Sequence, residues 1–255
     1  MPSVTDQGVC IRVWDWSETS QTLSLLTRAH GVLRCLAKGS KREHAGFSGG
    51  IELLTRGEVV ANLRPPDAGG GLTLLTAWDL QELFPGARRS LRAFRCAMAQ
   101  ADLVHHAILE RDPHPEVFDA LVGALRGLDE PGRDLHATAR FAWILLERTG
   151  HRPELNVDAG TGIALPGQPV YSFDPRRGVL FSDAPDADAG DARWRVRQET
   201  VDYLRTLDGK VGGPRAYPDA VAARALRLLL LYFREASGRE APAAGALLRS
   251  LESSG

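Results

Sequence analysis

Residues 8–42, GVCIRVWDWSETSQTLSLLTRAHGVLRCLAKGSKR, decide the fold of the N-terminal part of the chain. Apolar and polar residues alternate in GVCIRVWDW (8–16), which predicts a strand. The alternation gives it two faces, with Val9, Ile11 and Val13 on one and Cys10, Arg12 and Trp14 on the other. QTLSLLT (21–27) and VLRCLAKG (32–39) are two more predicted strands, joined by the short turn RAHG that ends in Gly31.

The same pattern continues as far as residue 84. GGIELLTRGEVVANL (49–63) predicts one or two strands behind a glycine pair. GLTLLTAWDLQELF (71–84) predicts the last strand, after the turn residues RPPDAGGG. About five short strands with glycine-rich turns in roughly eighty residues indicate a small barrel or sandwich.

From Pro85 onward, apolar residues recur at helical spacing. Helices are predicted over 87–111, 114–128 and 134–150, the last with Asp134 as its N-cap and Gly150 at its C-terminal side. Residues 151–192 break this pattern and predict a small hairpin-bearing insert that ends in a mobile acidic loop. Helices are predicted to resume over 195–207, 219–238 and 243–252. The chain is therefore predicted to be α+β, with one domain at 1–84 and a mainly helical domain at 85–255 that carries the insert 151–192.

Composition limits the classes of function. The chain has 255 residues, 44% of them hydrophobic, and a net charge of −1, so nucleic-acid affinity requires a local concentration of charge. Its three cysteines are far apart and favour reduced thiols over disulfides or a metal site. The first residues lack a signal-peptide pattern, and the longest apolar run, RALRLLLLYFREA, is too short to span a bilayer. We therefore expect a cytoplasmic protein with no membrane partner.

The stretch 28–42 is strongly basic, with no acid between Glu18 and Glu43 and two of the chain's three lysines. Its cations are Arg28, Arg34, Lys38, Lys41 and Arg42. Arg12, Trp14 and Trp16 belong to the neighbouring predicted strand. Cations beside aromatic rings suit a groove for single-stranded nucleic acid, because cations neutralise phosphates and rings stack on bases. The alternative is that both tryptophans are core residues and the cations only solubilise an edge strand.

The sequence also contains a second basic patch and several motifs that only partly match known metal, phosphate-binding or catalytic sites. The patch consists of Arg88, Arg89, Arg92 and Arg95. It could extend a nucleic-acid path or meet an acidic protein tail, and a solvated helix face explains it equally well. His106 and Glu110, at i and i+4, are too few for a metal site even with His105. DAGTG (158–162) lacks a P-loop lysine, no serine lies in a G-x-S-x-G elbow, and Asp186, Asp188 and Asp191 lack calcium-loop spacing. We therefore predict neither catalytic residues nor a cofactor.

The order of these parts resembles the bacterial recombination mediator family RecO. The family's first strand, acidic turn, L-T-x-x-x-G turn and basic loop correspond to Gly8–Ile11, Asp15–Glu18, Leu26–Thr27 with Gly31, and Lys38–Arg42. FSGGIELLTRGEVV, ELFPGARRSLRAFRCAMAQADLV and PEVFDALVGALRGL resemble the stretches that follow. The resemblance is strongest before residue 165 and implies an N-terminal five-stranded OB-fold followed by a helical domain.

The chain departs from the family pattern at one place. Many members carry a four-cysteine zinc knuckle, but here Asp158, Thr161, Phe181 and Ala184 occupy the cysteine positions. None of them can supply a thiolate to a structural zinc ion. We therefore expect a metal-free version of the knuckle, held together by apolar residues: Val170, Tyr171, Phe173, Leu180 and Phe181. Tightly bound zinc in the purified protein would refute this expectation.

The resemblance also implies a function. RecO proteins bind single- and double-stranded DNA, anneal complementary strands, and with RecR help to load RecA onto DNA coated by single-strand-binding protein, whose C-terminal tail docks on the helical domain. On this basis Arg34, Lys38, Lys41 and Arg42 are the expected phosphate ligands, with Arg12, Arg28, Trp14, Arg88, Arg89 and Arg92 as further candidates. Such a bacterial protein would be nucleoid-associated and non-enzymatic.

Other functions remain open from the residues alone. A generic OB-fold module for RNA or DNA, without a mediator role, would not bind RecR or the single-strand-binding protein. An enzyme that uses His105, His106 and Glu110 would lose its activity when His106 is changed. A purely structural partner protein would have no affinity for DNA.

Overall fold

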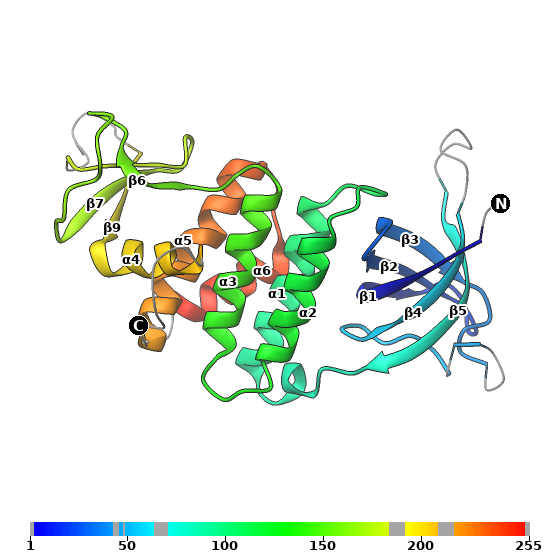
Figure 1. Ribbon diagram of the computed structural model, residues 1–255. Helices are drawn as coiled ribbons and strands as arrows, with labels where there is room; N and C mark the ends of the chain where they lie inside the picture. The colour runs from blue at the N-terminus through cyan, green and yellow to red at the C-terminus, as the bar shows by residue number, and fades with distance from the viewer. Residues whose placement is uncertain are drawn as a thin grey trace.

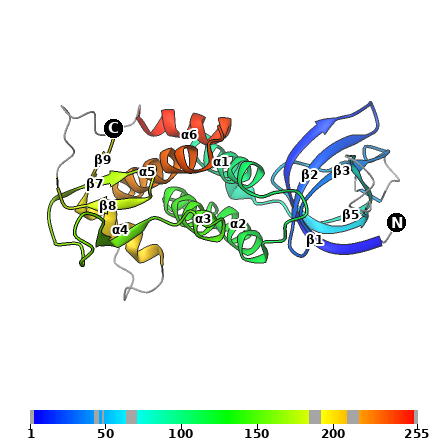
Figure 2. The ribbon, with the colours of Figure 1, turned by 90° about the horizontal axis from the view of Figure 1, so that it is seen from above.

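The computed structural model describes residues 3–42, 46–47, 49–63, 71–183, 192–208 and 217–252. A β-barrel lies at one end and a small β-sheet at the other, with the helices between them (Figure 1). The view from above shows the same order (Figure 2). This arrangement confirms the predicted α+β class.

Five strands form the N-terminal barrel. They are β1 (Ser3–Asp15), β2 (Gln21–Thr27), β3 (Gly31–Ala37), β4 (Arg56–Asn62) and β5 (Thr73–Glu82). The barrel is closed in the order β1-β2-β3-β5-β4. β3 and β5 run parallel, and every other neighbouring pair is antiparallel. This is the OB-fold arrangement that the resemblance implied.

A bulge in β1 changes which of its side chains face outward. The β1–β2 register shifts between Cys10 and Arg12, so Ile11 is the extra residue. A bulge reverses the alternation of faces that follows it. Arg12 therefore joins Ile11 on the side that faces the helices, whereas Val13 packs against the barrel interior. The predicted faces of β1 are right before the bulge and wrong after it.

The barrel interior is an apolar cluster separate from the rest of the core. Trp78 and Phe47 are its aromatic members, and Cys10 and Cys35 lie buried among them. Burial raises the pKa of the Cys35 thiol to about 12, so this thiol stays protonated at neutral pH. None of the three cysteines forms a disulfide, as predicted. The outer side of the barrel contributes instead to the larger cluster that fills the helical region.

Six α-helices and a short 3₁₀-helix follow the barrel in the described part of the chain. They are η1 (Pro85–Arg88), α1 (Leu91–Ala107), α2 (Pro115–Gly127), α3 (Asp134–Arg148), α4 (Gln198–Leu207), α5 (Asp219–Ser237) and α6 (Pro242–Glu252). The Ser90 hydroxyl caps α1 by accepting a 3.1 Å hydrogen bond from Ala93 N–H. The N-cap of α3 is Arg133, not Asp134 as predicted; Asp134 is the first residue of the helix, and its carboxylate bonds Arg92. Late in the chain, α6 returns to pack against α1.

A four-stranded sheet lies between α3 and α4 in sequence. Its strands are β6 (Glu154–Asp158), β7 (Val170–Asp174), β8 (Val179–Phe181) and β9 (Trp194–Arg197), in the order β6-β8-β7-β9. β7 and β8 form the predicted hairpin. The predicted mobile loop lies almost entirely in 184–191, outside the described residues. The division into domains 1–84 and 85–255, with 151–192 as an insert, stays a prediction.

The β2–β3 turn meets the loop after α1. Gly31 has a φ of 69°, and an added Cβ would lie 2.3 Å from the carbonyl oxygen of Asp112. Next to this contact, Arg111 N–H donates a 3.0 Å hydrogen bond to Val32 O. Because α1 ends at Ala107, Glu110 lies on this loop and bridges to Val32. His106 and Glu110 therefore do not lie on one helix, and the helix predicted over 87–111 is wrong beyond Ala107.

Candidate nucleic-acid interface

Two rows of paired side chains cross the outer face of β1, β2 and β3. The first row is Arg12, Ser24 and Arg34, and the second is Trp14, Thr22 and Leu36. Residues two apart on a strand face the same side, so the two rows share one face of the sheet. Lys38 follows Leu36 by two residues and extends this face at the end of β3. The six residues of the two rows together with Lys38 are the outer barrel face.

The aromatic side chains of this face are accessible. Trp14 is 50% exposed, and Trp16, just after β1, is 65% exposed. Trp78 fills the barrel interior instead. The alternative that Trp14 and Trp16 are core residues is therefore wrong. Exposed indole rings beside cations have the composition of a stacking surface for unpaired bases.

Most cations of the basic stretch lack a partner within the described part of the chain. Arg34, Lys38 and Arg42 are exposed, and their side chains form no hydrogen bond or ion pair there. Lys41 differs, because its ammonium lies 2.6 Å from a carboxylate oxygen of Asp15. Three of the four expected phosphate ligands are thus free to meet an anion, and the fourth would first have to leave Asp15.

Arg12 and Arg28 join the barrel to the helices. Arg12 forms an ion pair with Asp102 of α1, whose side chain is only 3% exposed. Arg28 donates two hydrogen bonds, of 3.0 and 2.9 Å, to the carboxylate of Asp119 on α2. These bonds lower the pKa of Asp119. Sequence reasoning missed both acids because they lie 90 and 91 residues from their partners.

The second basic patch is held by partners from several elements. Arg88 donates to the carbonyl of Leu83 and contacts Glu52, and Arg89 donates to the carbonyl of Asp129. Arg92 bonds the buried carboxylate of Asp134 at 2.7 Å. These contacts fix the start of α1 against its neighbours and leave the three arginines less available than Arg34 or Lys38.

An arginine-lined groove on the helical region was not predicted. A pocket of about 980 Å³ has an apolar lining that includes Leu91, Leu135 and Leu251. A neighbouring pocket of about 420 Å³ is lined by Trp194 and Leu228. Both pockets share three arginines and therefore adjoin: Arg197, Arg224 and Arg227. The two together are the arginine groove, and no single sequence window contains its parts.

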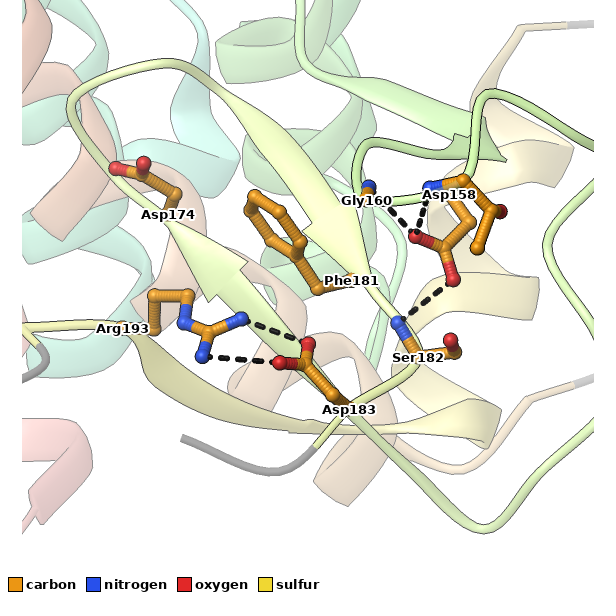
Figure 3. A pocket seen from close by; sticks show the side chains of 8 residues that line it. Asp158, Gly160, Asp174, Phe181, Ser182, Asp183 and Arg193 are labelled. Atoms are coloured by element: carbon orange, nitrogen blue, oxygen red, sulfur yellow. Dashed lines mark hydrogen bonds and ion pairs between the residues drawn. The ribbon is translucent and has the colours of Figure 1, made fainter. Parts of the chain in front are cut away.

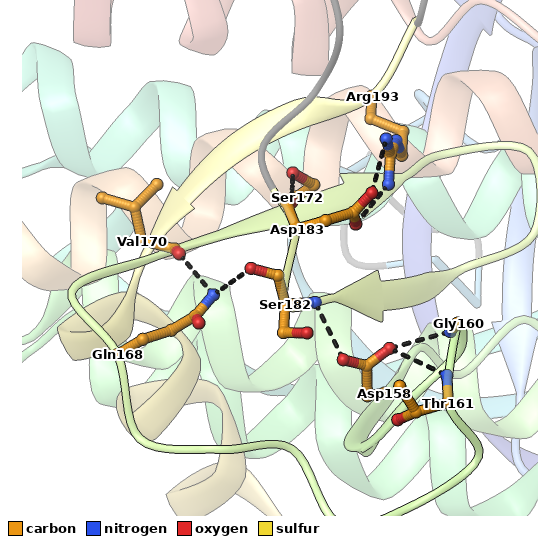
Figure 4. Close-up of polar contacts among 9 residues, drawn as sticks. All are labelled: Asp158, Gly160, Thr161, Gln168, Val170, Ser172, Ser182, Asp183 and Arg193. Atoms are coloured by element: carbon orange, nitrogen blue, oxygen red, sulfur yellow. Dashed lines mark hydrogen bonds and ion pairs between the residues drawn. The ribbon is translucent and has the colours of Figure 1, made fainter.

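Asp158 organises the region that corresponds to the knuckle. Its carboxylate accepts hydrogen bonds from the amides of Gly160 at 2.8 Å, Thr161 at 3.3 Å and Ser182 at 3.1 Å (Figure 4). The Asp158 side chain is 2% exposed. Hydrogen bonding by Ser182 and then by the other two amides lowers the pKa of this carboxyl. One carboxylate thus ties the turn after β6 to the end of β8.

The same region does not fit a structural zinc ion. Phe181, one of the four residues expected to stand in place of the knuckle cysteines, lies with its ring centroid 4.7 Å from the Arg193 guanidinium, and Arg193 pairs with Asp183 at 2.7 Å. These residues line an open pocket of about 600 Å³ (Figure 3). Position 158 offers a hydrogen-bonded carboxylate and no thiolate. Among the described residues, no group of three histidine, cysteine, aspartate or glutamate side chains could hold a metal.

We expect Asp158→Asn to loosen this region at neutral pH. The folded-state pKa is lowered, so the ionised carboxylate stabilises the fold above the ordinary pKa of an aspartate, and this stabilisation disappears as the pH falls through the lowered value. Hydrogen exchange at the amides of Gly160, Thr161 and Ser182 should become faster in the variant. Asp183→Asn, which loses an exposed ion pair, is the matched control. Unchanged exchange in Asp158→Asn would show that the apolar residues alone hold the region.

Two protein-family models match this chain. Residues 1–84 match the family model for "Recombination protein O N terminal", and residues 88–243 match that for "Recombination protein O C terminal". The chain belongs to the RecO family. Together the two models cover nearly all of the described barrel and helices.

Several relatives named "DNA repair protein RecO" support this placement. The one from Methylococcus capsulatus is 31% identical over 211 residues, 79% of this chain and 81% of the relative. The one from Anaeromyxobacter sp. (strain Fw109-5) is 27% identical over 91% of this chain and 90% of the relative. The one from Rhodopirellula baltica is 32% identical, but the match spans only 57% of this chain and 53% of the relative.

The described helices were also compared with the requirements of a membrane span. In residues 3–252, excluding the undescribed gaps, no helix has both the length and the apolar character needed to cross a bilayer.

Proposed function

We propose that this protein is a non-enzymatic DNA repair and recombination mediator whose outer barrel face binds single- and double-stranded DNA. The observation that carries the proposal is that Trp14 on β1, Arg34 on β3 and Lys38 just after β3 are all exposed on that face. Membership of a family of DNA repair proteins supports a repair role.

The outer barrel face suits single strands in particular. Arg34 and Lys38 would bind the phosphates, and the indole of Trp14 would stack on an unpaired base. Arg42 lies on the loop after β3, four residues beyond Lys38. Neutralising the charge on two single strands lowers their mutual repulsion, so the same contacts would promote annealing. Because neither binding nor annealing requires bond chemistry, no catalytic residues are needed.

The arginine groove supports the partner side of the proposal. Arg197, Arg224 and Arg227 lie beside apolar walls from α1, α5 and α6. Such a groove suits an acidic peptide with apolar side chains, and we propose that the C-terminal tail of the single-strand-binding protein docks there. Docking of this tail, together with RecR, would bring the protein to coated DNA and allow RecA to load.

The test of DNA binding is a titration of a fluorescent single-stranded oligonucleotide across a salt series. Arg34→Ala with Lys38→Ala is expected to lower affinity about tenfold or more at low salt, because two phosphate contacts are lost. The slope of log K against log salt should become shallower by about 1.4, or about 0.7 per phosphate. Arg140→Ala with Arg176→Ala removes the same charge from two exposed arginines elsewhere and should change little.

Two outcomes would count against parts of the proposal. Equal affinities and slopes for the two double variants would move the DNA site away from the outer barrel face. Titrations with RecR and with a labelled acidic tail peptide separate a mediator from a generic OB-fold nucleic-acid module, which would bind neither of them.

A further inference from the structure

A cluster of basic groups lies where the end of α1 meets the outer barrel face. His105 and His106 are half-buried, with their ring centroids 5.0 Å apart in an edge-to-face contact. Arg12 reaches the same turn of α1 by pairing with Asp102, three residues before His105. Because Arg12 belongs to the first row of the outer barrel face, this ion pair places the last turn of α1, which carries His105, beside that row.

The carboxylate in this cluster already has partners on both of its oxygens. The acid of this cluster is Asp102, whose charge raises the pKa of His105. One of its carboxylate oxygens pairs with Arg12, and the other accepts a 2.7 Å hydrogen bond from Ala243 N–H at the start of α6. From the loop before α6, Arg239 donates to the backbone oxygen of His106. The groups that face His105 therefore leave an excess of positive charge next to the proposed phosphate ligands.

We propose that His105 is a further phosphate-binding residue and takes up a proton from solvent when the outer barrel face binds a nucleic-acid phosphodiester. The inference rests on the proposed DNA binding. In the free protein, burial lowers the pKa of His105 most, followed by Arg12 and His106; Asp102 raises this pKa, and Arg34 lowers it by the smallest amount. The imidazole is therefore mostly neutral at pH 7. A phosphate beside Arg12 and Arg34 would offset their charges and accept a hydrogen bond from the imidazolium, which favours protonation.

The coupling between protonation of His105 and DNA binding fixes the direction in which affinity changes with pH. Between the lowered pKa of free His105 and its raised value in the complex, the complex holds more protons than the free protein. Affinity should therefore fall as pH rises, by up to about tenfold per pH unit within that window. Above the window, affinity should be independent of pH and carried by Arg34 and Lys38.

The experiment measures the affinity of the full chain for fluorescent oligo(dT) at constant ionic strength from about pH 5.5 to 8.5, where thymine and the phosphodiester do not titrate. The wild type should show the falling affinity. His105→Gln should be flat and match the wild type at high pH, and His151→Gln, which changes a half-buried histidine at the end of α3, should keep the wild-type profile.

Each result decides the matter. A flat wild-type profile, or the same slope in wild type and His105→Gln, would overturn the role of His105 while leaving DNA binding intact. No binding by the wild type at any pH would instead reject the proposed function, and this inference with it. Proton uptake on binding, measured by calorimetry in buffers of different ionisation enthalpy, should likewise disappear in His105→Gln.

Discussion

Replacing Gly31 by alanine is expected to destabilise the protein by at least about 3 kcal/mol. Two costs add at this position. The backbone has a φ of 69°, which disfavours any residue with a Cβ, and that Cβ would lie 2.3 Å from the carbonyl oxygen of Asp112. Since the atoms that this Cβ would meet belong to the backbone of Asp112, no side chain can move aside, and the contact between barrel and helical region must open. Denaturant unfolding of the variant measures the loss.

Gly238 provides a matched control for the backbone term. It has a similar φ of 62° at the end of α5, but no atom lies within 4 Å of the position of an added Cβ. Gly238→Ala should therefore cost only about 1 kcal/mol. Equal losses for the two variants would show that the β2–β3 turn moves away from Asp112 freely, contrary to the close contact described above.

The second large effect is expected for Phe173→Ala, at about 3–5 kcal/mol. Phe173 is fully buried in β7 and contacts Tyr232 of α5 edge to face, with ring centroids 5.3 Å apart. It also lies 5.9 Å from the ring of Trp194 on β9. Removing this ring would leave a cavity between the small sheet and α5. The free energy of unfolding from denaturant titration is the measurement.

An exposed phenylalanine gives the comparison for this substitution. Phe94 on α1 is 43% exposed, so Phe94→Ala should cost less than about 1 kcal/mol. A loss of similar size at Phe173 would mean that the small sheet contributes little to the global stability. The expectation that apolar residues replace a metal there would then be wrong. Zinc content of the purified protein tests that same expectation independently.

Much of the fold could be predicted because its signals are local. The alternation of β2 and β3 and the helical spacing of α1 to α3 depend on neighbouring residues, and both were recognised. The bulge after Cys10 could not be predicted, because it depends on how β1 pairs with a strand later in the chain. Likewise the end of α1 at Ala107 follows from a contact with Val32, which no helical pattern encodes.

For the candidate site, too, the residues marked by a local sequence signal could be predicted, whereas contacts between distant residues could not. Arg34 and Lys38 stand out in the sequence as part of a stretch without acids, and the barrel places both on its surface. The partners of Arg12 and Arg28 lie about ninety residues away, so the sequence could not show that these two arginines bind the helices. The arginine groove was missed for the same reason. His105 drew attention only as a metal ligand, because its neighbours belong to other elements.

The packing of α6 against α1 has a consequence for synthesis of the protein on the ribosome. α1 ends at Ala107, but its packing partner begins only at Pro242. At about 5–20 residues per second, roughly 7–30 s separate the two during translation. During that time the barrel can already fold around its own apolar cluster. The side of α1 that later packs against α6 is still exposed to solvent, and chaperones can bind it. A chain that stops before α6 would keep a folded barrel next to an unfinished bundle and would be a target for proteolysis.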